Sequence, residues 1–400
     1  MKIAVASSGL GHVARGIETW AMSLADPLAE RGVQVTLFGG AAPIERVSGF
    51  RCQVSGPESH SRACPIRVLP CLRRGDRAAR RLAACSPAFA WRWGLTSAYG
   101  WEQLSFWRRL WGILRAEGFD ILHVQDPMLA CWCQAFRRAG LLRTRVVLAH
   151  GTEESPEFLR RFSHVQHLAP WHRQALLDAN RSAGWTGKAR HYDIPNFVDI
   201  ETFRPATSVE KKAGRRELGI PEDAFVIGTV AAVKKSHKRM DYLIREFARL
   251  SRPAKAYLLA AGARTDESDV VRREADSLAA GRVKIEFDLP RERMPLLYGA
   301  MDVFVLTSLF EMMPIAVIEA MASGLPAITH RHPVLEWMAG EGGAGVDMRK
   351  DGALASFLES LSPDWIEARG RTARNRAVQM FSAEVVVGRI MEMYEEVLKE

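Results

Sequence analysis

The sequence predicts an α/β protein made of two Rossmann-like domains, each a parallel sheet wrapped by helices. Strand-like apolar runs alternate with helical segments through almost the whole chain, which is typical of parallel sheets. The alternation resets in a polar region at about 193–223, which marks the boundary between two series. A chain of 400 residues, 48% of them hydrophobic, is long enough for two such domains. We expect the two sheets to face each other across a cleft.

The elements follow in order along the chain. In the first series we expect strands at 2–6, 34–38, 121–124 and 145–149, and helices at about 16–31 and 128–138. In the second we expect strands at 225–231, 256–261, 283–287, 303–306 and 327–329. The predicted domains are an N-terminal domain over 1–195, a C-terminal domain over 196–382, and a closing amphipathic helix over 383–400 that crosses back to the first domain. Ligands of such sheets bind at the carboxyl ends of the strands.

Charge and cysteine content restrict the classes of function. A formal charge of +9 and a pI near 9.4 favour anionic partners such as nucleotide phosphates, acidic lipid surfaces or nucleic acid. Nucleic acid is disfavoured because the basic groups form no known reader motif. The cysteines are all in the first third of the chain without the spacing of a metal site, so we expect reduced thiols and no metal. They are Cys52, Cys64, Cys71, Cys85, Cys131 and Cys133.

We expect the chain in the cytoplasm. No uncharged apolar run reaches the roughly 18 residues that a membrane span needs, and the apolar start over 2–7 is too short for a signal peptide. One segment nevertheless suggests peripheral contact with the inner face of an anionic membrane, because its arginines are interleaved with tryptophans. The arginines are Arg73, Arg74, Arg77, Arg80, Arg81, Arg92, Arg108, Arg109 and Arg115, and the tryptophans are Trp91, Trp93, Trp101, Trp107 and Trp111.

Part of that segment has helical spacing. Leu104, Trp107, Trp111 and Leu114 fall on one side of a predicted helix, with arginines on the other sides. A basic amphipathic helix with tryptophans can lie in a membrane interface. The same stripe more often packs against its own domain, with the arginines solvated.

Two carboxylates eight positions apart, Glu311 and Glu319, indicate where the chemistry lies. Glu319 falls in a predicted helix over 315–323 that is otherwise apolar and that Pro314 can open. A buried carboxylate needs a hydrogen-bonding partner. Because side chains tilt toward a helix N-terminus, Glu319 can reach back to the open amides of the first turn, which also favour a phosphate. Two acids beside an anion site suit a nucleotide sugar. The alternative is that Glu319 pairs with a buried arginine and that Glu311 is a solvated loop residue.

Three further groups follow predicted strands. The glycine-rich segment 9–16 follows the first strand, and Gly11 allows close approach to a ligand, although the spacing fails as a dinucleotide fingerprint. His150 ends a strand and is either structural or a substrate contact. A basic loop after the first strand of the second domain can neutralise a diphosphate without metal, unless it is only a solvated surface loop. Its candidate residues are Lys234, Lys235 and Lys238.

Together these motifs resemble those of retaining glycosyltransferases of the GT-B fold, family 4. The resemblance is firmest in the C-terminal half, at 196–205, 225–230, 238–244, 297–308 and 320–326, and in Glu-Met-Met-Pro-Ile-Ala-Val-Ile-Glu at 311–319. In the N-terminal half only 16–19, 120–126 and the strand end at His150 match.

The resemblance implies a nucleotide-diphosphate sugar bound mainly by the C-terminal domain and an acceptor bound mainly by the N-terminal domain, with no cofactor. It assigns catalytic roles to Glu311 at the sugar hydroxyls, Lys238 at the diphosphate and His150 at the outer sugar hydroxyl. It places Glu319 at the ribose. It also places the backbone amides of Met312, Met313 and Ile315 close to the sugar and the phosphate. The other donor-binding residues that we expect are Gly11, Lys234, Lys235 and Pro314. The leaving phosphate would itself take the acceptor's proton, so catalysis would rest on positioning and charge stabilisation.

Three positions depart from the family pattern. Ala232 stands where an arginine is usual, so Lys234 or Lys235 would have to substitute for it. Met312 follows the first glutamate where glycine is frequent, and Phe197 also stands where glycine is common.

We therefore expect a metal-independent glycosyltransferase that acts on a glycoconjugate, polysaccharide or lipid-linked acceptor. The enzymatic alternative on the same fold is a nucleotide-sugar epimerase or a disaccharide phosphorylase. The alternative of a different class, suggested by Ala232, is a non-catalytic protein that binds a nucleotide sugar or a membrane.

Overall fold

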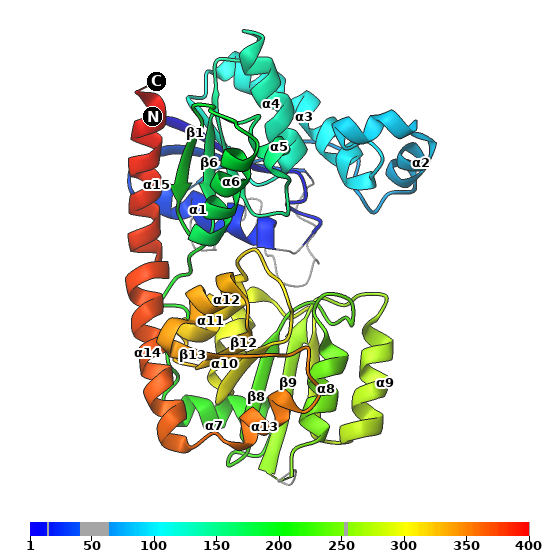
Figure 1. Ribbon diagram of the computed structural model, residues 1–400, viewed down its shortest axis with the longest axis vertical. Helices are drawn as coiled ribbons and strands as arrows, with labels where there is room; N and C mark the ends of the chain where they lie inside the picture. The colour runs from blue at the N-terminus through cyan, green and yellow to red at the C-terminus, as the bar shows by residue number, and fades with distance from the viewer. Residues whose placement is uncertain (14–15, 41–63, 252–254, 400) are drawn as a thin grey trace, which may run out of the picture. The chain divides into compact units, whose positions relative to one another are not determined.

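The computed structural model describes residues 1–400 except 14–15, 41–63, 252–254 and 400. The chain forms two compact units (Figure 1), the first comprising Met1–Pro195 with Val387–Glu400 and the second Asn196–Val386. Each unit contains one parallel sheet with helical connections, so the predicted pair of Rossmann-like domains is confirmed. Cys52 and part of the glycine-rich segment, residues 14–15, lie outside the described residues. The other five cysteines are free thiols.

The first unit has a seven-stranded sheet with the order β3-β2-β1-β4-β5-β6-β7 and parallel pairing. The register places Val5 of β1 beside Leu37 of β2 and His123 of β4. Its central strands are buried along their length, which is why they read as continuous apolar runs. The strands are β1 (Lys2–Ser7), β2 (Gln34–Gly39), β3 (Ile66–Val68), β4 (Ile121–Val124), β5 (Arg145–His150), β6 (His164–His167) and β7 (Arg190–Asp193).

The helices of the first unit include one that returns from the end of the chain. Helix α15 (Ala383–Leu398) begins in the second unit and continues in the first. There the hydroxyl of Tyr394 lies 2.7 Å from His123 Nδ1 of β4, in a buried contact. Burial lowers the pKa of His123 to about 3, so this ring is neutral. The others are α1 (Gly16–Glu30), α2 (Arg77–Cys85), the 3-10 helix η1 (Ala88–Trp93), α3 (Ala98–Glu117), α4 (Pro127–Arg138), α5 (Pro156–Leu159) and α6 (Pro170–Ser182).

The tryptophan stripe predicted on α3 packs against the core of its own unit. Leu114 is fully buried. The ring centroids of Trp107 and Trp111 lie 4.8 Å and 5.4 Å from that of Phe136 on α4. Both rings also pack against the main hydrophobic cluster of this unit. Of the two interpretations of the stripe, packing against its own domain is therefore the one that the structure supports.

The second unit has a six-stranded parallel sheet with the order β10-β9-β8-β11-β12-β13. Its strands are β8 (Phe225–Val230), β9 (Ala256–Gly262), β10 (Val283–Phe287), β11 (Val303–Leu306), β12 (Ala327–His330) and β13 (Gly343–Val346). Its helices include α7 (Ser208–Glu217), α8 (Met240–Ala248), α9 (Ser268–Ala279), α10 (Met294–Gly299), α11 (Ile315–Ala322), α12 (Pro333–Ala339), α13 (Ala353–Glu359) and α14 (Pro363–Phe381). Among the helices that the structure describes, none is long and apolar enough to cross a bilayer.

The strand order reverses direction once in each sheet, between β1 and β4 in the first unit and between β8 and β11 in the second. At such a switch point the two connections leave on opposite faces of the sheet, which opens a crevice at the carboxyl ends of the two strands. Ligands of open α/β sheets bind there. The loops that follow β1, β4, β8 and β11 are therefore where a site is expected.

Candidate active site

The switch point of the second unit brings together the basic loop and the first glutamate. Lys238 lies in the loop after β8, and Glu311 lies in the loop after β11. The Lys238 ammonium donates a hydrogen bond to Glu311 Oε1, and His237 Nε2 lies 3.8 Å from the same oxygen. Glu311 is buried, so the alternative that it is a solvated loop residue is wrong. A carboxylate in this position is stable only because a cation accompanies it.

The position of Lys238 is fixed by its own backbone. The hydroxyl of Thr307, which directly follows β11, donates to the carbonyl of Lys238 at 2.7 Å. The flanking residues His237 and Arg239 have positive φ angles of 66° and 52°, a conformation uncommon in residues other than glycine. Conformational strain of this kind is often kept at functional sites because surrounding contacts hold it in place.

The two other lysines of the basic loop differ in their surroundings. Glu267 accepts hydrogen bonds from the backbone amides of Lys235 and Ser236, both at 2.9 Å. The Lys235 ammonium lies 3.8 Å from a carboxylate oxygen of Glu274 on α9. Lys234 makes no ion pair with a residue that the structure describes. Lys234 and Lys235 are the two candidates for replacing the arginine missing at position 232. Within the described structure, Lys234 has fewer contacts with carboxylates than Lys235.

Helix α11 begins within the predicted donor-binding segment 312–315. Pro314 is its N-cap, and no side chain caps its first turn, which Ile315 opens. The carbonyl of Met313 accepts a hydrogen bond from Asn196 Nδ2 at 2.9 Å, which fixes the peptide before the helix. Met312, its neighbour, is half-buried. A helix N-terminus without a side-chain cap presents its amides and the positive end of the helix dipole, which favour an anion.

Glu319 has different partners from those expected. It is buried, but its carboxylate accepts from the Tyr298 hydroxyl at 2.8 Å and pairs with Arg291 Nη1 at 2.8 Å, rather than reaching back to the amides of Ile315 and Ala316. Tyr298 is fully buried, and burial together with the Glu319 charge raises its pKa well above the ordinary value. The predicted arginine partner is present, although Arg291 is one-third exposed rather than buried. Sequence reasoning did not identify which arginine this is, because Arg291 lies in a short 3-10 helix before α10, far from Glu319 along the chain.

The switch point of the first unit is filled by the chain's own polar side chains. Glu102 of α3 accepts hydrogen bonds from His12 Nε2 at 2.8 Å, from the Ser8 hydroxyl at 3.1 Å, and from Arg74. Asp126, after β4, accepts from the Ser8 amide and from Tyr99. Sequence reasoning missed this cluster because α3 also contains Arg108, Arg109 and Glu117, so the single charge of Glu102 gives no distinctive signal along the chain.

The pKa values of Glu102 and Glu18 in this cluster are shifted in opposite directions. Burial alone would raise the pKa of Glu102, but hydrogen bonds from His12 and Arg74 lower it below its ordinary value. For Glu18 of α1, burial and then the charge of Asp126 raise the pKa well above the ordinary value. The Arg74 guanidinium hydrogen-bonds to the Glu102 carboxylate but lies 3.8 Å from the nearest Glu18 oxygen. Arg74 therefore neutralises the charge of Glu102 more fully than that of Glu18.

The glycine loop packs closely over the cluster. Gly11 has a φ of 97°, which only glycine adopts easily. A Cβ atom added to Gly9 would lie 2.1 Å from a carboxylate oxygen of Glu18. Both glycines are thus required by the backbone and by the carboxylates beneath it, whether or not a ligand also contacts the loop.

His150, at the end of β5, starts a row of histidines. Its Nδ1 lies 3.3 Å from Nδ1 of His167 on β6, whose Nε2 lies 3.1 Å from Nδ1 of His191 on β7. Burial and then the nearby His172 lower the pKa of His150 to about 3, so the ring is neutral. Among the residues that the structure describes, none hydrogen-bonds to its buried Nε2. Sequence reasoning found His150 but not its partners, because a histidine pairing across strands leaves no pattern along the chain.

The predicted residues thus fall into two groups. Lys238, Glu311, Glu319 and the start of α11 belong to the second unit. Gly11 and His150 belong to the first unit.

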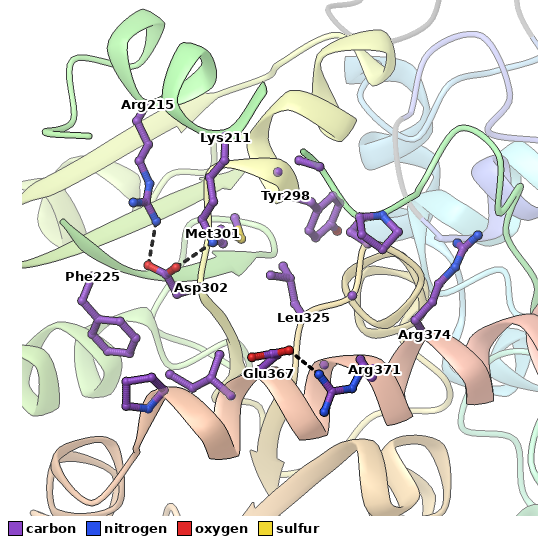
Figure 2. Close-up of a pocket in the computed structure, with 18 of the residues that line it drawn as sticks. Lys211, Arg215, Phe225, Tyr298, Met301, Asp302, Leu325, Glu367, Arg371 and Arg374 are labelled. Atoms are coloured by element: carbon purple, nitrogen blue, oxygen red, sulfur yellow. Dashed lines mark hydrogen bonds and ion pairs between the residues drawn. The ribbon is translucent and has the colours of Figure 1, made fainter. Parts of the chain in front are cut away.

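A separate cavity of about 740 Å³ lies at the amino ends of the strands of the second sheet, opposite the ends that carry Lys238 and Glu311. It is lined by Phe225 at the start of β8, by Asp302 before β11 and by Leu325 before β12. In Figure 2, Lys211 and Arg215 both point at Asp302, at 2.6 Å and 2.7 Å. No predicted donor residue lines this cavity, and its cations are engaged in the fold. We therefore do not place the active site there.

Solved structures share the fold over the whole chain. Sucrose-phosphate synthase from Thermosynechococcus elongatus superposes with a TM-score of 0.75 at 18% identity, covering 100% of this chain and 99% of that one. HepE of Anabaena, solved in complex with UDP-glucose, superposes with a TM-score of 0.70 at 17% identity, covering 99% and 100%.

The two halves of the sequence match two family models. Residues 14–186 match Glycosyltransferase Family 4, and residues 210–376 match Glycosyl transferases group 1. The chain thus carries one domain of each family on a GT-B fold. The chain is 30% identical to the D-inositol 3-phosphate glycosyltransferase of Corynebacterium urealyticum over 188 residues, 44% of each chain. It therefore matches less than half the length of this curated relative.

Proposed function

We propose that this protein transfers a glycosyl group from a nucleotide-diphosphate sugar to a glycoconjugate, polysaccharide or lipid-linked acceptor. The C-terminal domain, residues 196–382, would bind the donor, and the N-terminal domain, residues 1–195, the acceptor. The observation that carries the proposal is the contact between Lys238 and Glu311 at the switch point of the second sheet, with the start of α11 following Glu311 in sequence.

Each part of that arrangement fits one part of a nucleotide sugar. The uncapped start of α11 and the Lys238 ammonium are both suited to the diphosphate. Glu311 would release part of its bond to Lys238 and accept from hydroxyls of the transferring sugar. Glu319, already the acceptor for Tyr298 and Arg291, would accept from a ribose hydroxyl. Lys234 would supply the charge missing at Ala232.

We infer that transfer retains the anomeric configuration and needs no metal ion. The bond from the anomeric carbon to the diphosphate oxygen breaks, and a bond to the acceptor oxygen forms on the same face. The acceptor's proton passes to the leaving diphosphate. Lys238 and the amides of α11 would stabilise the charge that develops on the diphosphate, which is the role a metal ion has in other enzymes.

His150 would hold an outer hydroxyl of the donor sugar. Its buried Nε2 is available for such a contact, whereas its Nδ1 is engaged with His167. Two similar proteins support this proposal through the ligand or the activity that is known for them. HepE has been solved with UDP-glucose, and the C. urealyticum relative is a D-inositol 3-phosphate glycosyltransferase.

The first test is a thermal-shift screen of nucleoside diphosphates, followed by their sugars, because a ligand that binds the native state raises its stability. Nucleotide release is then measured with and without candidate acceptors. We expect release to depend on the acceptor. A sugar altered without any acceptor would instead identify an epimerase, and tight donor binding with no release under any condition would identify a non-catalytic binding protein.

A further inference from the structure

The first unit carries three exposed aromatic side chains on one short segment. Phe89, Trp91 and Trp93 of η1 are 63%, 65% and 51% exposed, and we call them the aromatic tip. Leu82, one turn before the end of α2, is 38% exposed. Single exposed apolar residues are ordinary, whereas several together mark a surface that contacts something apolar.

Exposed arginines accompany the aromatic tip. Arg77, Arg80 and Arg81 lie on α2 and Arg92 lies within η1, and we call these four the basic collar. From residue 77 to residue 101 the sequence contains no aspartate or glutamate. Within the described part of the chain, the structure pairs none of the four guanidinium groups with a carboxylate. The collar is thus a concentration of positive charge that the fold leaves unneutralised there.

The fold holds this segment in a defined shape. Gly94 ends η1 in the left-handed conformation, and a Cβ added to Gly100 would lie 1.8 Å from the Gly94 carbonyl oxygen, so η1 and α3 meet in close backbone contact. Ser97 caps α3 through a bond from the Gly100 amide at 3.0 Å. The indole of Trp101 donates to the Ser86 hydroxyl at 3.3 Å, which joins the end of α2 to α3. In Figure 1 the cyan segment carrying α2 stands away from the strands of its unit.

We propose that the aromatic tip and the basic collar form a docking surface for the headgroup region of an anionic phospholipid bilayer. Tryptophan and phenylalanine rings are suited to the boundary between headgroups and acyl chains, and arginines beside them to the lipid phosphates. The surface is too small for a stable protein partner, because such interfaces use roughly 20–30 residues a side. This proposal does not depend on transferase activity. Trp107 and Trp111 pack against the core, so the contact residues come from the part of the arginine and tryptophan segment that the fold leaves exposed.

The test is sedimentation of the full-length protein with vesicles of phosphatidylcholine alone or mixed equally with phosphatidylglycerol. We expect binding to the anionic vesicles, weakened by salt. Replacing the tip (Phe89→Ser, Trp91→Ser, Trp93→Ser) should lower the partition coefficient at least about tenfold. A matched variant with exposed apolar residues replaced elsewhere (Leu141→Ser, Trp171→Ser, Val209→Ser) should bind like the wild type. Circular dichroism confirms that both variants are folded.

A second variant separates charge from insertion. Replacing the collar (Arg77→Gln, Arg80→Gln, Arg81→Gln, Arg92→Gln) should remove most of the preference for anionic over neutral vesicles. A conservative pair, Trp91→Phe with Trp93→Phe, should still bind but show less fluorescence quenching by brominated lipids than the wild type. Equal retention of the wild type and the folded tip variant would overturn the proposal. So would binding of the wild type to single-stranded oligonucleotides but not to vesicles.

Discussion

Lys238 and Glu311 form a largely buried ion pair between two loops that leave neighbouring strands, β8 and β11, on either side of the switch point. Each residue therefore holds the other in place before any ligand binds. Thr307 adds a second link, because its hydroxyl binds the Lys238 carbonyl. A diphosphate entering this site would meet a cation that is already oriented, which reduces the cost of ordering it on binding.

Removing the charge of Lys238 should weaken nucleotide binding. We expect Lys238→Met to lower the affinity for the preferred nucleoside diphosphate by about tenfold to a hundredfold, the usual range for a hydrogen bond to a charged group. Calorimetry measures this directly. Lys350→Met, which changes an exposed lysine of the same unit, serves as the control and should leave the affinity unchanged. If both variants bind like the wild type, Lys238 does not contact the diphosphate.

Glu319 should act on donor binding more than on the fold. Glu319→Ala is expected to lower nucleotide affinity about tenfold while the domain stays folded. Because the Tyr298 hydroxyl holds Glu319, Tyr298→Phe should have a smaller effect in the same direction, and the double variant should resemble Glu319→Ala. Unchanged nucleotide affinity of Glu319→Ala would remove Glu319 from the site and leave it as a structural partner of Arg291.

Glu18 should make the folded state less stable as the pH rises. Its pKa is raised in the fold, so the stability it contributes is fully present below its unfolded pKa and is lost as the pH rises through the folded value. Glu18→Gln should therefore be more stable than the wild type at high pH, by about 1.4 kcal/mol for each unit of the raised pKa, with the difference vanishing in acid. Urea unfolding at several pH values measures it, with the exposed Glu30→Gln as control. A constant difference across the pH range would contradict the assignment.

His150 should affect turnover rather than donor affinity. His150→Ala is expected to abolish turnover with the donor affinity largely kept, and His167→Phe to lower turnover about tenfold by freeing the His150 ring. Steady-state kinetics and calorimetry together separate the two effects. Normal turnover of His150→Ala would return this residue to a structural role.

The pH dependence of His150 follows from its lowered pKa. The folded value is about 3 against an ordinary 6.5, so its contribution to stability is present above 6.5 and is lost as the pH falls toward 3. The ring therefore stays neutral near neutral pH. A limb of the wild-type turnover profile between about pH 5 and 9 that disappears in His150→Gln would contradict this.

Much of the fold could be predicted because its central strands are apolar runs separated by helical sequence. The predicted strand at 121–124 matches β4, and the one at 303–306 matches β11. Strands β6 and β7 were missed because their residues are mostly histidine, glutamine, arginine and aspartate. β13 was missed because two of its four residues are glycine.

The candidate site was predicted in part, for a related reason. Glu311 and Lys238 lie in motifs that are recognisable along the chain, but their contact depends on the order of strands in the sheet. The partners of Glu319, and the cluster around Glu102, join segments far apart in sequence, which periodicity cannot show. The tryptophan stripe illustrates the limit, since the spacing of Trp107 and Trp111 is equally suited to a core and to a membrane surface.

The most direct test of the central claim is nucleotide release from the preferred nucleotide sugar, measured for the wild type and for Glu311→Gln with and without acceptor. We predict release by the wild type that requires acceptor, and release at least about a hundredfold slower in Glu311→Gln, since the variant loses charge at the reacting sugar. Glu201→Gln, an exposed glutamate of the same unit, should behave like the wild type. Equal rates for the wild type and Glu311→Gln would contradict the assignment of the active site to this switch point.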